Sequence, residues 1–207
     1  MSKITFFVKA SVSIDGTFDK WDASLTFTSG DVSTGVLDVK IQAASVNTGS
    51  GFKDDKLRSD DFFDAKKDPS ITFRSTKIVQ TGPHTFDVPG TFTIRGVSKP
   101  ETLALTDDTE GKGTGEIKGT MTFDRKEFGM NSGIPLIRIA DRVEVTIDFK
   151  VKRVSGPPLL FKQEPMLESR AVHAPSSIEL LRGLGRNETI WFWRQQTPPV
   201  SLRKTQR

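Results

Sequence analysis

Residues 143–151 read Val-Glu-Val-Thr-Ile-Asp-Phe-Lys-Val, and this stretch decides the fold class. Apolar side chains occupy every second position, and Glu, Thr, Asp and Lys occupy the positions between them. A period of two residues is that of a β-strand with one buried face and one face in water. The same alternation recurs in the ranges 3–9, 11–18, 21–27, 37–43, 71–75, 86–94, 103–105 and 117–123. The sequence therefore predicts an all-β protein.

Short turns separate these alternating segments, for example at 29–31 and 110–113. We count about eight or nine strands, depending on whether residues 3–18 form one bent strand or two. Consecutive strands with short connections make an antiparallel meander, and eight such strands can close into a barrel around side chains or one ligand. A two-layered sandwich has the same alternation, so periodicity alone leaves both architectures open.

Two segments depart from the alternation. Residues 51–70 carry Leu57, Asp61 and Phe62 at helical spacing and end near Pro69, which predicts a short helical insertion in a long loop at the mouth of the fold. From residue 156 onward Pro, Gln, Ser and Arg dominate. We therefore predict a folded domain over 1–155 and an irregular, poorly ordered tail over 156–207, in which residues 177–181 are able to start a short helix.

The charge distribution argues against a nucleic-acid partner. The chain has 30 Lys and Arg against 26 Asp and Glu, and residues 164–207 contribute seven against four. The remaining residues carry 23 against 22, so the body is almost neutral and its charges are interspersed. Such a surface binds a phosphate backbone poorly. No stretch approaches the roughly 18 to 20 consecutive apolar residues that a membrane-spanning helix needs.

The supply of reactive side chains is small. There is no cysteine, and the two histidines are His84 and His173. The composition excludes disulfides, zinc–thiolate sites and thiol nucleophiles, and leaves almost no material for a Ser–His triad or a His-rich metal site. We therefore expect no catalytic residues, no metal and no cofactor.

A cluster of five carboxylates, Asp54, Asp55, Asp60, Asp61 and Asp64, gives one alternative. Paired carboxylates perform glycoside hydrolysis, so this cluster could serve a carbohydrate-active or other hydrolytic enzyme. Lys and Arg side chains interleave with it, and the spacing of a calcium loop is absent. Local ion pairs and helix capping are the favoured interpretation.

Four parts of the sequence resemble the YceI-like family. The signature is Lys-Asp-Asp-Lys-Leu-Arg-Ser-Asp-Asp-Phe-Phe-Asp at 53–64, followed by Pro-Ser-Ile-Thr-Phe-Arg-Ser-Thr at 69–76. Residues 7–9 with 16–18 resemble the opening strands of the family, residues 90–100 its middle hairpin, and residues 123–129 with 141–143 its end. The resemblance spans about residues 2–153. The family pattern has His at two positions where this sequence has Ala10 and Lys56.

This resemblance implies a lipocalin-like, eight-stranded antiparallel barrel whose elongated apolar interior holds a polyisoprenoid chain, with the polar head near the mouth. It implies a binding protein rather than an enzyme, with a long-chain isoprenoid or similar lipid as partner, held for transport or storage. It also implies export to the periplasm. No signal peptide is visible at the start, so we expect a cytoplasmic protein if that start is genuine. A homodimer stays open.

On this interpretation the apolar residues of the inward faces line the ligand site: Phe6, Val8, Ile14, Phe18, Phe73, Phe92, Ile94, Phe123, Val145, Ile147 and Phe149. Arg58 and Asp61 are expected at the mouth, where they would orient the polar head. Alternation identifies a buried face and says nothing of empty volume, so filling a solid core is the alternative for each lining residue. A non-catalytic interaction protein that docks through its tail is a third alternative.

Overall fold

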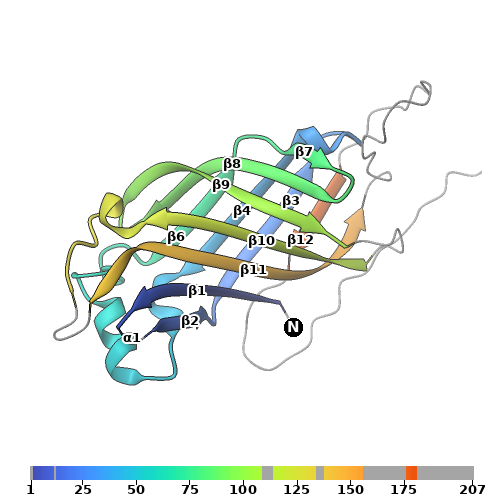
Figure 1. Cartoon of the computed structure of the whole chain (residues 1–207). Helices are drawn as coiled ribbons and strands as arrows, with labels where there is room; N and C mark the ends of the chain where they lie inside the picture. The colour runs from blue at the N-terminus through green and yellow to red at the C-terminus, as the bar shows by residue number, and fades with distance from the viewer. Residues whose placement is uncertain (1, 12, 109–113, 134–137, 156–175, 181–207) are drawn as a thin grey trace, which may run out of the picture.

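The computed structural model of the protein describes residues 2–11, 13–108, 114–133, 138–155 and 176–180, and for 153–155 and 176–180 it describes the backbone (Figure 1). These residues form a 12-stranded sheet, one α-helix and three short 3₁₀ helices. In chain order the elements are β1 (Lys3–Ala10), β2 (Ile14–Phe18), β3 (Trp21–Phe27), η1 (Val32–Thr34), β4 (Gly35–Gln42), η2 (Ala43–Ser45), β5 (Val46–Asn47), α1 (Gly51–Arg58), β6 (Ser70–Ser75), β7 (Val79–Gly82), β8 (Thr85–Ile94), β9 (Val97–Asp107), β10 (Thr114–Asp124), η3 (Arg125–Phe128), β11 (Ile139–Ser155) and β12 (Ser176–Leu180).

Antiparallel pairing joins these strands into a wall that closes on itself. The order around the wall is β10, β9, β8, β6, β4, β3, β12 and β11, and β11 pairs again with β10. β2 and β3 are separated by Asp19 and Lys20 and act as two halves of one bent strand, with β2 pairing to β1 and β3 pairing to β12. The predicted eight-stranded antiparallel barrel is confirmed.

One position of the wall is shared end to end by β12 and β1. β1 pairs with β11 from Lys3, opposite Asp148, onward, and β12 pairs with the adjoining stretch of β11 from Leu180, opposite Val151. Both strands run antiparallel to β11, so the two segments from opposite parts of the sequence point the same way along one line.

β12 lies within the segment that the sequence predicts to be an irregular tail. The short helix expected over 177–181 is wrong, since Ser176–Leu180 is a strand. Its backbone supplies hydrogen-bonding partners to the facing edges of β3 and β11, which would otherwise be unpaired, and this outweighs the weak helical signal. The other parts of the predicted tail, 156–175 and 181–207, lie outside the described residues.

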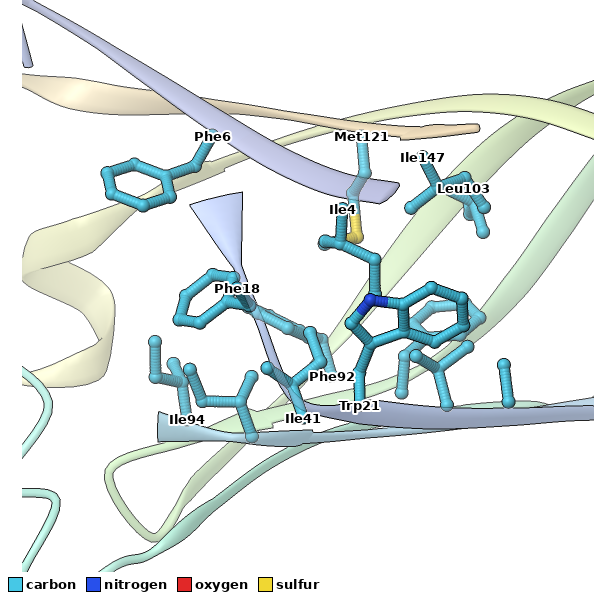
Figure 2. Packing of buried hydrophobic residues seen from close by; sticks show 14 of the residues in the cluster. Ile4, Phe6, Phe18, Trp21, Ile41, Phe92, Ile94, Leu103, Met121 and Ile147 are labelled. Atoms are coloured by element: carbon cyan, nitrogen blue, oxygen red, sulfur yellow. The ribbon is translucent and has the colours of Figure 1, made fainter. Parts of the chain in front are cut away.

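The inner face of the wall carries the apolar residues of the alternating pattern. In β3, for example, Trp21, Ala23, Leu25 and Phe27 are all buried. Trp21 stacks on Phe149 from β11 with ring centroids 4.8 Å apart, and Figure 2 shows how such side chains fill the interior from facing strands. The core thus extends along the inside of the barrel.

The helix α1 lies at one end of the barrel, together with η3 (Figure 1). We call this the α1 end. The predicted helical insertion at 51–70 is confirmed as the eight-residue helix α1 and the turns that follow it. Its buried side chains Leu57, Phe62 and Phe63 join the core cluster of the barrel. α1 therefore packs onto the barrel interior as a cover.

Candidate ligand-binding site

The α1 end of the barrel holds an apolar cavity of about 70 Å³. Among the described residues that line it, Arg125 carries a charge and the others are apolar. The lining comprises Ile4, Phe6, Val8, Ile14, Phe18, Ile41, Leu57, Phe62, Phe63, Ile71, Phe92, Ile94, Phe123, Arg125, Met130, Ile139, Val143 and Val145. A cavity of this chemistry attracts apolar groups rather than water.

Eight of the eleven apolar residues predicted to line a ligand site border this cavity: Phe6, Val8, Ile14, Phe18, Phe92, Ile94, Phe123 and Val145. The other three, Phe73, Ile147 and Phe149, are buried in the core but do not border it. Contact between any of these side chains and a ligand stays a prediction. What the structure establishes is that the strand alternation identifies the inward face correctly.

The cover of the cavity was not among the predicted lining residues. Leu57 comes from α1, and Phe62 and Phe63 come from the turns after it. The amide of Phe63 donates to the carbonyl of Leu57 (2.9 Å), and the Phe63 ring lies 5.8 Å from that of Phe18 on the wall. The available signal was that these apolar residues lie in the insertion that interrupts the two-residue alternation, although Leu57 and Phe62, five residues apart, do not share one face of a helix.

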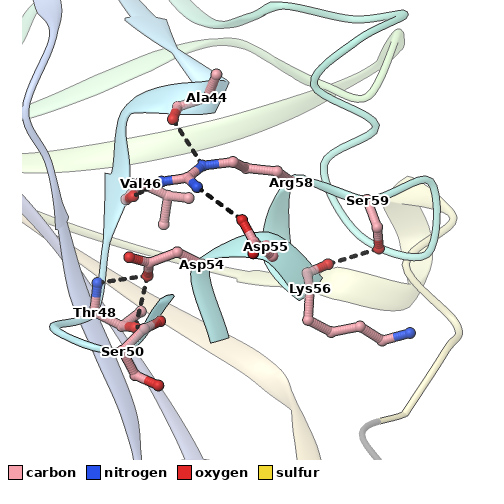
Figure 3. Close-up of polar contacts among 9 residues, drawn as sticks. All are labelled: Ala44, Val46, Thr48, Ser50, Asp54, Asp55, Lys56, Arg58 and Ser59. Atoms are coloured by element: carbon pink, nitrogen blue, oxygen red, sulfur yellow. Dashed lines mark hydrogen bonds and ion pairs between the residues drawn. The ribbon is translucent and has the colours of Figure 1, made fainter. Parts of the chain in front are cut away.

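Asp54 of the predicted acidic cluster fixes the start of α1. The carboxylate of this buried residue accepts from the amide of Thr48 at 2.8 Å and from its hydroxyl at 2.7 Å (Figure 3). A carboxylate in the first turn also interacts favourably with the helix dipole. Asp54 therefore anchors α1 to the loop before it, whereas the N-cap residue Ser50 makes no side-chain cap hydrogen bond.

Arg58, predicted to lie at the mouth, is the last residue of α1 and does not border the cavity. Its Nε donates to the carbonyl of Ala44 (2.9 Å), its Nη2 to the carbonyl of Val46 (3.0 Å), and its Nη1 pairs with Asp55 (3.1 Å; Figure 3). The guanidinium thus ties the end of α1 to the loop that carries η2 and β5. This arrangement gives Arg58 a structural task of its own.

Asp61 also lies at the α1 end, and its partners differ from those of Arg58. One carboxylate oxygen pairs with Lys56, and the other accepts from the hydroxyl of Ser132 at 2.7 Å. The hydrogen bond from Lys56, reinforced by the one from Ser132, lowers the pKa of Asp61 below its usual value. Asp61 therefore stays ionised and links the cover to the segment after η3.

Arg125 is the residue that sequence reasoning missed. It is the first residue of η3, borders the cavity and is only 6% exposed. Its guanidinium donates to the carbonyls of Ala140 (3.1 Å), Met130 and Ser132 (2.9 Å), and its Nη2 contacts Asp141 at 3.3 Å. A sequence signal was available, because Arg125 stands two residues after Phe123 and continues the inward positions of Met121 and Phe123, but the predicted lining was chosen from apolar residues alone.

A second, open hollow of about 400 Å³ lies where β9 and β10 part. Their pairing runs from Asp107 opposite Ile117 to Ala104 opposite Thr120 and stops there. The hollow is lined by Pro100, Glu101, Thr102, Thr120, Met121 and Thr122. Burial, and then the charge of Glu127, raises the pKa of Glu101. This hollow is mainly polar and suits an apolar chain less than the interior does.

Within the described residues there is no cluster of three or more His, Asp or Glu side chains able to hold a metal ion. In the same part of the chain, no helix is long and apolar enough to cross a membrane.

Comparison with known proteins links the chain to one family. Residues 1–151 match the YceI-like domain. A UPF0312 protein of Pseudomonas syringae pv. tomato is 31% identical over 140 residues, which cover 65% of this chain and 72% of that protein. A UPF0312 protein of Pseudomonas putida is 36% identical over 122 residues, which cover 56% and 64% respectively.

Three solved structures share the fold. BcnA of Burkholderia cenocepacia superposes with a TM-score of 0.64 at 28% identity, over 71% of this chain and 94% of that one. The YceI protein of Campylobacter jejuni gives 0.57 at 31% identity, over 67% and 84%. A polyisoprenoid-binding domain from Saccharophagus degradans gives 0.58 at 18% identity, over 71% and 91%, and shows likeness of fold. The barrel geometry and the match over residues 1–151 together establish that this chain belongs to the YceI-like family.

Proposed function

We propose that the protein binds a long-chain isoprenoid or similar amphipathic lipid non-covalently inside the barrel. The observation that carries this proposal is the cavity at the α1 end, which is apolar on every side except at Arg125. Burying an isoprenoid chain there removes its apolar surface from water, at about 25 cal/mol per Å². The Saccharophagus degradans domain of the same fold is described as polyisoprenoid binding, which is in keeping with this use of the barrel.

The size of the cavity sets a condition on this function. Ligand pockets commonly measure about 300 to 1,000 Å³, whereas this cavity measures about 70 Å³. A long chain therefore enters only if apolar side chains or the cover at Leu57, Phe62 and Phe63 move aside. Moving the cover would break ring contacts such as Phe63 to Phe18 and the hydrogen bond from Ser132 to Asp61, but no strand pairing of the described wall. We propose binding for transport or storage in the periplasm, with the cover as the moving part.

The described carboxylates do not favour the hydrolytic alternative. Asp54, Asp55 and Asp61 each have protein partners, and the pKa of Asp61 is lowered rather than raised, which is the opposite of what a general acid needs. None of the three borders the cavity.

Native mass spectrometry of protein purified without detergent tests the proposal. We expect a mass increment that disappears after extraction with organic solvent and returns when the extracted protein is incubated with a long isoprenoid alcohol. Protein extracted and refolded without added lipid provides the control. Bare protein mass before extraction, together with no uptake of isoprenoid by folded protein, would contradict lipid binding.

A further inference from the structure

The charge balance around Arg125 is unusual for a buried side chain. The residue is 6% exposed and borders a cavity whose other described lining is apolar. Removing a guanidinium from water is costly unless an opposite charge compensates it. Three of its four hydrogen bonds go to neutral backbone carbonyls, those of Ala140, Met130 and Ser132. Those carbonyls satisfy its N–H groups but carry no net charge.

Among the described residues, one carboxylate lies within reach of Arg125, and it compensates the charge only in part. Asp141 lies 3.3 Å from the guanidinium and 2.9 Å from the ammonium of Lys126. The hydrogen bond from Lys126 is the main cause that lowers the pKa of Asp141, and the contribution of Arg125 is smaller. One carboxylate is therefore shared by two cations. One positive charge is left over beside the cavity.

The neighbouring contacts leave this excess in place. Ser132, which accepts from Arg125, donates to Asp61, and Asp61 is already paired with Lys56. Arg95 donates to the carbonyl of Gly129, the residue directly after η3, at 2.6 Å. The bonded network at the α1 end thus contains four cations, Arg125, Lys126, Lys56 and Arg95, and three carboxylates, Asp141, Asp61 and Asp124, the last of which accepts from the amide of Lys126 at 2.8 Å. Because cations outnumber carboxylates in it, this network favours the binding of an anion.

We propose that Arg125 recognises the anionic end of the lipid, a phosphate or a carboxylate, and so sets the orientation of the chain in the barrel. This inference rests on the proposed function and names the class of ligand. Four of the five N–H groups of Arg125 have partners among the described residues, and the fifth, on Nη2, has none there and would donate to the anion. The anion would also exchange for the weak contact to Asp141. The chain would then run along Phe123, Phe18 and Phe6 toward the other end of the barrel.

The test compares three probes: a long isoprenyl monophosphate, the isoprenol of the same length, and inorganic phosphate. Binding is measured by calorimetry on the full chain, with thermal unfolding as a check on folding. Arg125→Met is expected to weaken binding of the isoprenyl phosphate by tenfold or more and to change isoprenol binding by less than twofold. Arg125→Lys keeps the charge but loses the planar fork of the guanidinium, so its affinity for the isoprenyl phosphate should lie between those of the wild type and of Arg125→Met.

A second variant avoids the risk that Arg125→Met fails to fold. Asp141 is 39% exposed at its side chain, and Asp141→Asn frees the charge of Arg125 without removing a buried group. We expect it to strengthen isoprenyl phosphate binding about threefold and to leave isoprenol binding unchanged. Arg74→Gln is the matched control, because Arg74 also pairs with a carboxylate, that of Asp38, but its side chain is 69% exposed and it does not border the cavity. It should change the ratio of the two affinities by less than twofold.

The outcomes separate this inference from the proposal on which it rests. If neither lipid binds the folded wild-type protein, lipid binding itself fails. If both lipids bind wild-type protein equally and Asp141→Asn leaves both affinities unchanged, lipid binding holds and the role of Arg125 is overturned. Binding of inorganic phosphate as strong as that of the isoprenyl phosphate would assign the charge to a free anion and overturn recognition of a lipid head.

Discussion

Val145→Phe distinguishes a ligand cavity from a solid core. Val145 is partly buried on β11, borders the cavity and pairs with Phe6 on β1. The substitution adds about 50 Å³ of side-chain volume, and the cavity of about 70 Å³ has room for it. Filling a cavity stabilises the fold by roughly 24 cal/mol per Å³, so the gain in stability is about 1 kcal/mol. An imperfect rotamer costs about 0.5 to 1.5 kcal/mol. We therefore expect the free energy of unfolding of lipid-free protein to stay within about 1 kcal/mol of the wild-type value.

The same substitution should weaken lipid binding. Filling about 50 Å³ displaces roughly two methylene groups of a bound chain, each worth about 0.8 kcal/mol, so the Kd of a long isoprenol should rise about tenfold. Urea unfolding of lipid-free protein gives the first quantity, and calorimetric titration gives the second.

Val88→Phe is the matched control for this experiment. Val88 on β8 is fully buried and does not border the cavity, so the same enlargement overpacks the core and should cost about 1 to 3 kcal/mol of stability. A Val145→Phe variant that loses as much stability as Val88→Phe and binds isoprenol like the wild type would refute the reasoning. It would mean that the interior near Val145 is a solid core.

Three further outcomes follow from the structure. Phe128→Ala empties a fully buried site and should lower the free energy of unfolding by about 3 to 5 kcal/mol in urea, whereas a loss below about 1 kcal/mol would show that the cluster collapses around it. Burial, followed by the hydrogen bond and charge of Glu116, raises the pKa of Asp148, so its ionised form weakens the fold. Asp148→Asn should therefore raise the free energy of unfolding by about 0.5 kcal/mol at pH 7 and leave it unchanged below about pH 3. A difference between variant and wild type that stays constant across this pH range would contradict the assignment. Truncation after Ser155 removes β12 and should lower the midpoint of thermal unfolding by at least about 4 °C, with an unchanged midpoint showing that Ser176–Leu180 adds nothing.

The barrel was predictable because its wall obeys a rule that sequence carries directly. In 143–151 and in β3, alternation assigns each side chain to a face, and the buried faces follow it. β12 could not be predicted in this way. Five residues give too short a pattern, and their partners on β3 and β11 are set by which edges the rest of the chain leaves unpaired.

The site was predictable in its apolar part and not in its polar part. Phe18, Phe92 and Val145 were found because they continue the strand pattern into the cavity. Arg58 drew attention as a cation in the signature stretch, yet its donors are directed to carbonyls outside the cavity. Arg125 continues the inward positions of Met121 and Phe123 one step past the end of β10, but a charged side chain at an inward position departs from the apolar pattern by which the lining was chosen.

The wall position shared by β12 and β1 has a consequence for biosynthesis. Ser176 pairs with Phe27 across 149 residues of sequence, so the ribosome delivers this strand after all the other described strands. At about 5 to 20 residues per second, the 25 residues from Ser155 to Leu180 take roughly 1 to 5 s to make. During that interval the edges of β3 and β11 are exposed to other nascent chains, which is the situation in which strand edges aggregate. Closure of the barrel is therefore the last step of its maturation, and its timing is set by translation.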